Sequence, residues 1–267
     1  MKKYDKVILL SDMDGTLLNS ESKVSKENQE AIKDFMEQGG KFGIATGRSR
    51  FNSLSIMEGV KVNIPCILLN GSAVYDFNTQ EYVSVSELPK DKLLKFLEFI
   101  QKEYPKVAIQ IYCPNMCYFV SIKEFADEHI CSIHQPNVFS QLNDIIDIPW
   151  IKILFYGAME VLELLNTYLI DFELGHVVDR VFSGPNYFEI LPEGANKGNA
   201  MLKLREKMPG EYKIYAVGDY NNDIEMIKAA DVGIATENSN SALKEVADII
   251  TVSNDESVIA DIIYRIM

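Results

Sequence analysis

Short apolar runs without alternation recur near both ends of the chain, and each is followed by polar residues and a helical pattern. The clearest are residues 6–10 (KVILL), 42–45 (FGIA) and 213–217 (KIYAV). A strand that is apolar on both faces is typical of a parallel sheet, because helices cover such a sheet on both sides. Strands alternate with helices in these parts of the chain, as the crossover connections of a parallel sheet require. The pattern therefore predicts an α/β fold.

The middle of the chain follows a different pattern. Residues 74–77 and 82–85 flank a polar turn and predict a hairpin. Further strands are predicted at 108–120 (two strands), 151–155, 181–183 and 187–191, with helices near 93–100 and 161–169. The strand–helix alternation returns at Lys197. We therefore expect an α/β core made of residues 1–82 and 188–267, and an inserted α+β domain made of residues 83–187.

Composition limits what the protein binds. The 267 residues include 39 Asp and Glu against 26 Lys and Arg, a formal net charge of −13. Such a chain repels the phosphates of nucleic acids and anionic lipids, and it has no run of Lys and Arg to build a basic patch. No apolar stretch approaches the roughly 18 residues of a membrane span, and the apolar block 7–10 is too short for a signal peptide. With four cysteines, a reduced cytoplasmic protein is expected, with neither nucleic acid nor membrane as partner.

Polar residues of unusual types follow several of the predicted strands. Residues 12–16 (DMDGT) follow the first strand, residues 46–48 (TGR) the second, and residues 218–223 (GDYNND) a later one. Another polar loop, residues 196–198 (NKG), precedes a predicted helix. Proteins with parallel sheets bind ligands at the carboxyl ends of their strands. These loops are therefore expected to converge on one site.

Asp12 and Asp14 lie two residues apart, directly beyond the first strand, and share a face where the segment is extended. One alternative is an ordinary Asp-rich turn in which Gly15 only supplies the bend. A calcium-binding EF-hand loop is excluded, because Leu17 and Lys23 occupy the positions that require Gly and Glu. The pair alone leaves both a turn and a functional site open.

Asp219 and Asp223 strengthen the interpretation as a site. Several carboxylates at one sheet edge repel one another unless a cation lies among them. A set of oxygen ligands favours Mg²⁺, which commonly keeps water molecules and a substrate phosphate in its coordination shell. No cluster of histidines accompanies these residues to suggest zinc.

Carboxylates beside Mg²⁺ support phosphoryl transfer. One carboxylate can attack phosphorus and form an aspartyl-phosphate, and a second can protonate the leaving group and then deprotonate water. The transferring phosphoryl group needs a hydroxyl, loop amides and a cation, for which Thr46, Gly47 and Lys197 are the candidates. The alternatives are that Thr46 is a helix N-cap and that Lys197 is a solvated lysine at a helix start.

Together these segments resemble the four motifs of the haloacid dehalogenase-like superfamily. Residues 12–18 (DMDGTLL) resemble motif I, 45–48 (ATGR) motif II, 191–198 (LPEGANKG) motif III and 218–223 motif IV. The Thr-Gly-Arg and Asn-Gly pieces, and an insertion between motifs II and III, are similar to the Cof-type phosphatase branch with its type IIB cap. The resemblance implies a Rossmann-like parallel-sheet core and an inserted α+β cap that selects the substrate.

The resemblance also implies a role for each matching residue. Asp12 is expected to be the nucleophile and a Mg²⁺ ligand, and Asp14 the general acid/base, with its backbone carbonyl also on the metal. Asp219 is expected to be the remaining protein ligand, and Asp223 to support the metal or the lysine. Arg48 and Asn70 are expected to line the mouth of the site. The phosphoryl group is expected to be bound by Met13, Thr46, Gly47, Lys197 and Asn222.

The implied activity is hydrolysis of a small phosphomonoester: a sugar phosphate, a nucleotide or a phosphorylated cofactor. A phosphomutase or other phosphotransferase that uses the same aspartyl-phosphate is the main alternative, because the first half-reaction is shared. A silent module that binds phosphorylated metabolites is a third hypothesis, and it predicts the loss of Asp12 or Asp219, both of which are present. The oligomeric state is left open.

The inserted region offers one competing site. Cys113, Cys117, His129, Cys131 and His134 are residues of the types that bind zinc. Their spacing is not that of a standard zinc site, and the first two flank a predicted hairpin turn. Buried thiols are the favoured interpretation.

Overall fold

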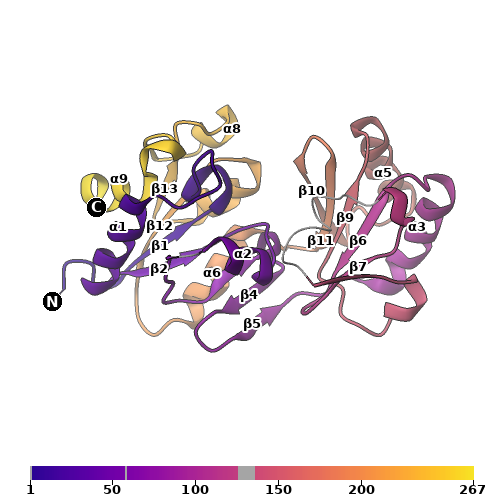
Figure 1. Ribbon diagram of the computed structural model, residues 1–267, viewed down its shortest axis with the longest axis horizontal. Helices are drawn as coiled ribbons and strands as arrows, with labels where there is room; N and C mark the ends of the chain where they lie inside the picture. The colour runs from indigo at the N-terminus through magenta and orange to yellow at the C-terminus, as the bar shows by residue number, and fades with distance from the viewer. Residues whose placement is uncertain (1, 58, 126–135) are drawn as a thin grey trace. The chain divides into compact units, whose positions relative to one another are not determined.

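The structure, a computed structural model, describes residues 2–57, 59–125 and 136–267. The chain divides into two compact units. The core unit comprises Met1–Ser84 and Asn196–Met267, and the inserted unit comprises Val85–Ala195. Figure 1 shows the two chain ends in the core unit, so that the inserted unit is one continuous stretch in the middle of the sequence.

The core unit is built on a five-stranded sheet in the order β14-β13-β12-β1-β2, and every pairing in it is parallel. Ile8, Leu9 and Leu10 in the central strand are buried, as expected of a strand covered on both faces. This confirms the predicted parallel α/β sheet. The strands are β1 (Val7–Ser11), β2 (Lys41–Ile44), β12 (Lys213–Gly218), β13 (Val232–Ala235) and β14 (Ile249–Ile250).

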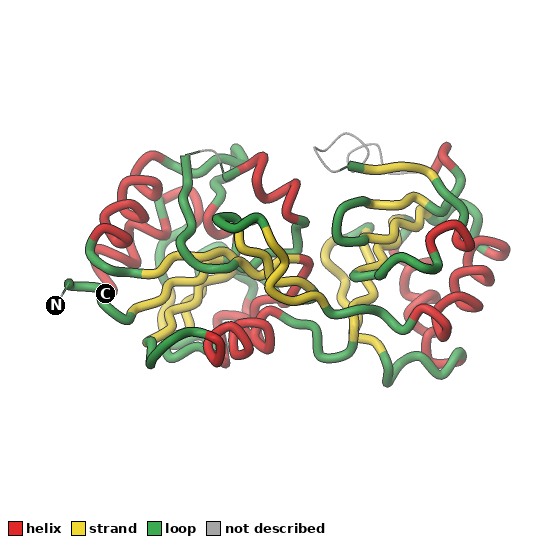
Figure 2. The backbone as a smooth tube through the Cα atoms, turned by 90° about the horizontal axis from the view of Figure 1, so that it is seen from below, coloured by secondary structure: helices red, strands yellow, loops and turns green. Residues whose placement is uncertain are grey.

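Helices lie on both sides of this sheet (Figure 2). Ile8 and Leu10 share a hydrophobic cluster with Met201 of α6 and Met226 of α7. Helix α1 packs against β2 and α9, and Ser25 caps its first turn by accepting a hydrogen bond from the amide of Asn28. The helices are α1 (Lys26–Glu37), α2 (Arg50–Ile56), α6 (Lys197–Lys207), α7 (Ile224–Ala229), α8 (Ser241–Lys244) and α9 (Val258–Asp261).

A small three-stranded sheet in the order β3-β4-β5 extends the core unit. Its strands are β3 (Cys66–Leu68), β4 (Ala73–Asp76) and β5 (Glu81–Val85), and β4 and β5 form the predicted hairpin. A parallel bridge between Ala45 and Ile67 places β3 beside the end of β2. The turn Leu69–Gly71 between β3 and β4 therefore starts at the edge where the strands of the main sheet end.

The inserted unit is a six-stranded sheet in the order β10-β11-β9-β6-β7-β8 with two helices on one face. Alternate residues of its central strands, such as Ile109, Ile111 and Phe155, pack with Phe96 of α3 and Leu165 of α5. The elements are α3 (Lys90–Glu103), β6 (Ala108–Tyr112), β7 (Cys117–Phe119), β8 (Asn137–Phe139), β9 (Lys152–Tyr156), α5 (Met159–Asp171), β10 (Val178–Gly184) and β11 (Tyr187–Pro192).

Two features of the inserted unit differ from the sequence prediction. The insertion was predicted at residues 83–187, whereas the compact unit spans 85–195: residues 83–84 belong to the core unit, and β11 belongs to the inserted unit because it pairs with both β10 and β9. The short edge strand β8 was not predicted. It pairs in parallel with β7, whereas the other pairings of this sheet are antiparallel.

Across the residues that the structure describes, none of the helices combines the length and the apolar character that a membrane crossing requires.

Candidate active site

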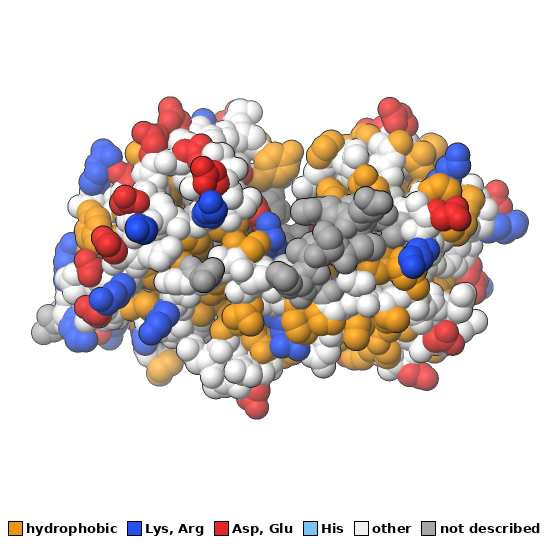
Figure 3. Space-filling model, viewed as in Figure 1, with side chains coloured by type: hydrophobic (Ala, Val, Ile, Leu, Met, Phe, Trp, Pro, Cys, Tyr) orange, Lys and Arg blue, Asp and Glu red, His pale blue; other side chains and the backbone are white. Residues whose placement is uncertain are grey.

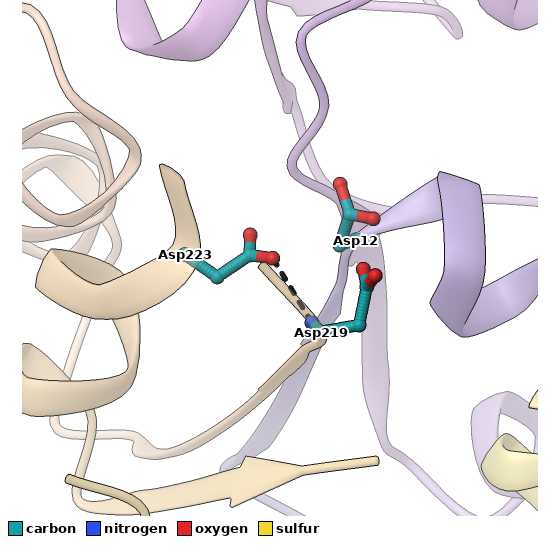
Figure 4. A group of neighbouring side chains, drawn as sticks. All are labelled: Asp12, Asp219 and Asp223. Atoms are coloured by element: carbon teal, nitrogen blue, oxygen red, sulfur yellow. Dashed lines mark hydrogen bonds between the residues drawn. The ribbon is translucent and has the colours of Figure 1, made fainter. Parts of the chain in front are cut away.

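The carboxyl ends of β1 and β12 bring Asp12 and Asp219 together. The two strands are neighbours in the sheet, with Ser11 paired to Val217, so the residues that follow them lie at one edge. The amide of Asp12 continues the ladder by donating to the carbonyl of Val217 at 2.9 Å. Asp12, Asp219 and Asp223 each offer a carboxylate oxygen, and these oxygens lie within 4.8 Å of one another (Figure 4).

A tight turn after β1 brings the backbone at Gly15 close to this cluster. Gly15 has a φ of +75°, and a Cβ at that position would collide with the carboxylate of Asp219. Glycine is therefore required both by the backbone conformation and by the close approach. The hydroxyl of Thr16 donates to Oδ1 of Asp219 at 3.2 Å, and the side-chain amide of Asn238 donates to the carbonyl of Gly15 at 2.8 Å. Sequence reasoning missed both contacts. Thr16 lies within the quoted motif, whereas nothing in the sequence marks Asn238.

Lys197 lies at the centre of the site. Its side chain is fully buried, and Nζ donates to Oδ1 of Asp12 and to Oδ1 of Asp223, both at 2.6 Å. The alternative of a solvated lysine at a helix start is therefore wrong. Asn196 caps α6 by accepting from the amide of Asn199 at 2.7 Å, which fixes the start of the helix and the place of Lys197.

Asp223 has both carboxylate oxygens engaged. Oδ1 accepts from Lys197, while Oδ2 accepts from the backbone amides of Asp219 and Tyr220 at 3.1 and 3.2 Å. The carboxylate therefore orders the loop that carries Asp219 and holds Lys197 at the same time. Figure 4 shows Asp223 directed at the backbone of Asp219.

Burial and crowding perturb the ionisation of these groups. Burial raises the pKa of Asp12 well above its ordinary value; Lys197 opposes the rise, and the neighbouring aspartates add to it. Burial and the charge of Asp223 raise the pKa of Asp219 to about 6. Burial alone would lower the pKa of Lys197, but Asp12 and Asp223 together raise it. The ammonium of Lys197 is therefore charged at neutral pH.

The residues present fit a divalent cation. Within the described structure, the four aspartates of the site are paired with two cationic side chains, Lys197 and Arg48. With all four carboxylates ionised, the negative charges exceed the two positive ones by two. The neighbouring aspartates add to the rise in the pKa of Asp12 and Asp219 that burial mainly causes. All the donors are oxygen atoms, which is the set that Mg²⁺ prefers.

The loop after β2 carries Thr46, Gly47 and Arg48. Thr46 is buried, and its hydroxyl accepts from the amide of Arg48 at 3.1 Å. The alternative that Thr46 caps the next helix is wrong, because Ser49 is the N-cap of α2. The guanidinium of Arg48 forms two hydrogen bonds with the carboxylate of Asp14, each of 2.7 Å. This bidentate ion pair joins the loop after β2 to the loop after β1.

The remaining predicted site residues lie near these loops. The side-chain amide of Asn222 donates to Oδ1 of Asn70 at 3.1 Å, and Asn70 is buried. Met13 is buried between the two aspartates, and its carbonyl accepts from the amide of Leu18 at 2.8 Å. The structure therefore brings residues from all four sequence motifs to one edge of the core sheet.

The competing zinc set is not assembled among the described residues. Cys113 and Cys117 are buried cysteines in the inserted unit, and burial raises the pKa of Cys113 to about 12. A neutral thiol is a poor metal ligand. His129, Cys131 and His134 lie outside the described residues. In the part of the chain that the structure describes, the group able to hold a metal is Asp12, Asp219 and Asp223.

Comparison with known proteins gives consistent matches along nearly the whole chain. Residues 9–263 match the haloacid dehalogenase-like hydrolase family. A Bacillus subtilis protein named 5-amino-6-(5-phospho-D-ribitylamino)uracil phosphatase YwtE is 30% identical over 96% of both chains. The chloroplastic endoribonuclease YBEY of Arabidopsis thaliana is 31% identical over 96% of this chain, which spans 46% of that protein. The crystal structure of a haloacid dehalogenase-like hydrolase from Bacteroides thetaiotaomicron superposes with a TM-score of 0.87 at 25% identity, covering 99% of this chain and all of that one.

Proposed function

We propose that this chain, which belongs to the Cof-type haloacid dehalogenase-like hydrolases and hydrolyses phosphoric monoesters, is a Mg²⁺-dependent phosphatase. We further propose that Asp12 is its nucleophile. The observation that carries this proposal is the buried carboxylate of Asp12, held by Lys197 at 2.6 Å beside a second carboxylate at the same sheet edge. Such a group has the position and the cationic support that attack on phosphorus requires.

Asp12, Asp219 and the backbone carbonyl of Asp14 would hold the Mg²⁺ ion. When bound, the ion supplies positive charge against the phosphate oxygens. Asp223 has both oxygens engaged by Lys197 and by backbone amides, so we assign it a supporting role rather than a direct one.

The proposed reaction has two half-reactions that share one site. A carboxylate oxygen of Asp12 forms a bond to phosphorus while the bond to the substrate oxygen breaks, and Asp14 gives that oxygen a proton. This step requires the carboxyl of Asp14 to leave its ion pair with Arg48. Asp14 then takes a proton from water, whose oxygen attacks the aspartyl-phosphate and releases inorganic phosphate and free Asp12. Charge on the phosphoryl oxygens is stabilised by Lys197, the hydroxyl of Thr46, the amides of Met13 and Gly47, and Asn222.

We propose a small phosphorylated metabolite as substrate: a sugar phosphate, a nucleotide or a phosphorylated cofactor. The phosphorylated ribitylaminouracil in the name of the relative YwtE supports a polyol phosphate among the candidates. We assign the choice of substrate to the inserted unit, whose sheet and helices are separate from the reacting groups. Acidic and basic side chains are interspersed on the face seen in Figure 3. From the net charge of −13 we propose a cytoplasmic protein that binds neither nucleic acid nor membranes.

Removal of Mg²⁺ is expected to abolish phosphate release, because the excess carboxylates then have no counter-charge and the phosphate dianion is repelled. Phosphate release is measured from a panel of sugar phosphates, nucleotides and phosphorylated cofactors, with Mg²⁺ or with EDTA. Mg²⁺ is also expected to raise the melting temperature, since it binds only the folded site. Undiminished release in EDTA would contradict the metal assignment, and isomerised sugar phosphate without release would identify a phosphomutase instead.

Asp14→Asn is expected to slow the hydrolysis of alkyl phosphates by about 100-fold, because the leaving alkoxide then receives no proton. The first half-reaction with p-nitrophenyl phosphate should be slowed less, since nitrophenolate leaves without protonation. Hydrolysis of the aspartyl-phosphate still needs the base, so this variant should release a burst of nitrophenolate followed by slow turnover. Equal losses with both substrates and no burst would show that Asp14 is not the acid/base.

A further inference from the structure

The turn Leu69–Gly71 at the end of β3 holds an uncommon backbone conformation. Leu69, Asn70 and Gly71 follow one another with φ values of 51°, 56° and 98°. A non-glycine residue in this left-handed region costs roughly 1 kcal/mol, and asparagine tolerates it better than leucine. Both Leu69 and Asn70 are 3% exposed, so this strain is held inside the protein and not in a free surface loop.

The turn is bonded directly to the loop after β2. The amide of Asn70 donates to the carbonyl of Thr46 at 3.0 Å, and the amide of Leu69 donates to the carbonyl of Arg48 at 3.1 Å. Gly47, between them, packs so closely that a Cβ there would lie 3.0 Å from Oδ1 of Asn70. The backbone of the loop after β2, which carries Thr46, Gly47 and Arg48, is therefore held in place by this turn.

The same turn contacts two further loops of the site. Oδ1 of Asn70 accepts a hydrogen bond from the side-chain amide of Asn222 at 3.1 Å, in the loop that carries Asp219. A Cβ on Gly71 would collide with the backbone carbonyl of Asn196, the residue before Lys197. One short segment thus touches the loops of Thr46, Lys197 and Asp219.

We propose that Asn70 is a positioning residue that sets the relative places of these three loops. This inference rests on the proposed phosphatase function and adds a residue that acts through other groups. The left-handed backbone conformation places the side-chain amide of Asn70 between Gly47 and Asn222. A right-handed backbone conformation would point this side chain in another direction. The strain is retained because the hydrogen bonds and packing around the turn specify it.

Asn70→Gly provides the test, because glycine accepts the left-handed conformation without cost and only the amide is lost. We expect the melting temperature to be kept or raised, kcat to fall by about 10- to 100-fold, and inorganic phosphate to inhibit more weakly, since small displacements of positioning groups slow turnover strongly. Gln80→Gly is the matched control: Gln80 has a φ of 60° and is exposed between β4 and β5, away from the site. It should relieve similar strain and leave kcat unchanged.

A double-mutant cycle with Asn222→Ala separates positioning from direct contact with substrate. If Asn70 acts through Asn222, the double variant should lose little more than Asn70→Gly alone. The proposal would be overturned if the losses in kcat of the two single variants add up in the double variant. It would also be overturned if Asn70→Gly has the kcat and the phosphate inhibition of the wild type. The phosphatase function fails separately, if the wild type hydrolyses no phosphomonoester. In that case, calorimetric binding of inorganic phosphate with Mg²⁺ still decides: weaker binding by Asn70→Gly supports positioning, and equal binding or none by either protein rejects it.

Discussion

Replacing Asp12 by asparagine is expected to lower kcat by about 10,000-fold or more, because the amide cannot form the phosphoenzyme. The fold should survive. Asp12 is buried among three other aspartates that oppose its charge, and asparagine has the same shape without that charge. The measurement is phosphate release at saturating substrate and Mg²⁺, together with the melting temperature of both proteins.

Two further observations make this result specific to the nucleophile. Acid-quenched wild type should retain radioactive phosphate on the protein during turnover, and Asp12→Asn should retain none. Asp12→Glu should also be inactive, since its carboxylate is displaced by one methylene and no longer meets phosphorus in line. An Asp12→Asn variant that keeps activity within tenfold of wild type, at high purity, would reject the assignment of the nucleophile.

Lys197→Met is expected to damage both catalysis and stability. The lysine is fully buried and holds Asp12 and Asp223 at 2.6 Å each, so methionine leaves two buried carboxylates without their cation. Loss of one partner from a buried ion pair costs about 3–5 kcal/mol of folding free energy. Loss of the cation beside the phosphoryl group should lower kcat/KM by about 1,000-fold.

The two effects can be measured separately. Chemical denaturation gives the free energy of unfolding, and kcat/KM is measured well below the melting temperature of the variant. Lys203→Met makes the same substitution at an exposed position of α6 and should change neither quantity. A Lys197→Met protein with a wild-type kcat/KM would remove Lys197 from the reaction, whatever its stability.

The convergence of Asp12 and Asp219 was predictable because each directly follows a buried strand, and the carboxyl ends of parallel strands lie at one edge of the sheet. That the two strands are direct neighbours is shown by the structure and was not predicted from the sequence. The two hydrogen bonds of Lys197 to Asp12 and Asp223 were not predictable, because the sequence of a helix start does not tell whether its lysine is solvated or buried. The bidentate pair of Arg48 with Asp14 depends on side-chain conformations that no periodicity reports.

The boundary of the inserted unit shows a different limit. A strand was predicted at residues 187–191, where the structure has β11 (Tyr187–Pro192), but the apolar character of this segment does not say which sheet it joins. Its partners, β9 and β10, place it in the inserted unit. The edge strand β8 is three residues long and partly exposed, so neither hydrophobic pattern nor length marks it. Sequence periodicity therefore predicts elements better than it predicts their partners.

The continuity of residues 85–195 has a consequence for how such a protein can change over generations. This stretch carries its own hydrophobic core, and every aspartate proposed for the reaction lies outside it. Mutations that alter substrate choice can therefore accumulate in the part of the gene that encodes residues 85–195, while the residues that carry out the reaction are under separate selection. Recombination that exchanges this part of the gene whole would transfer a preference for one metabolite without rebuilding the chemistry.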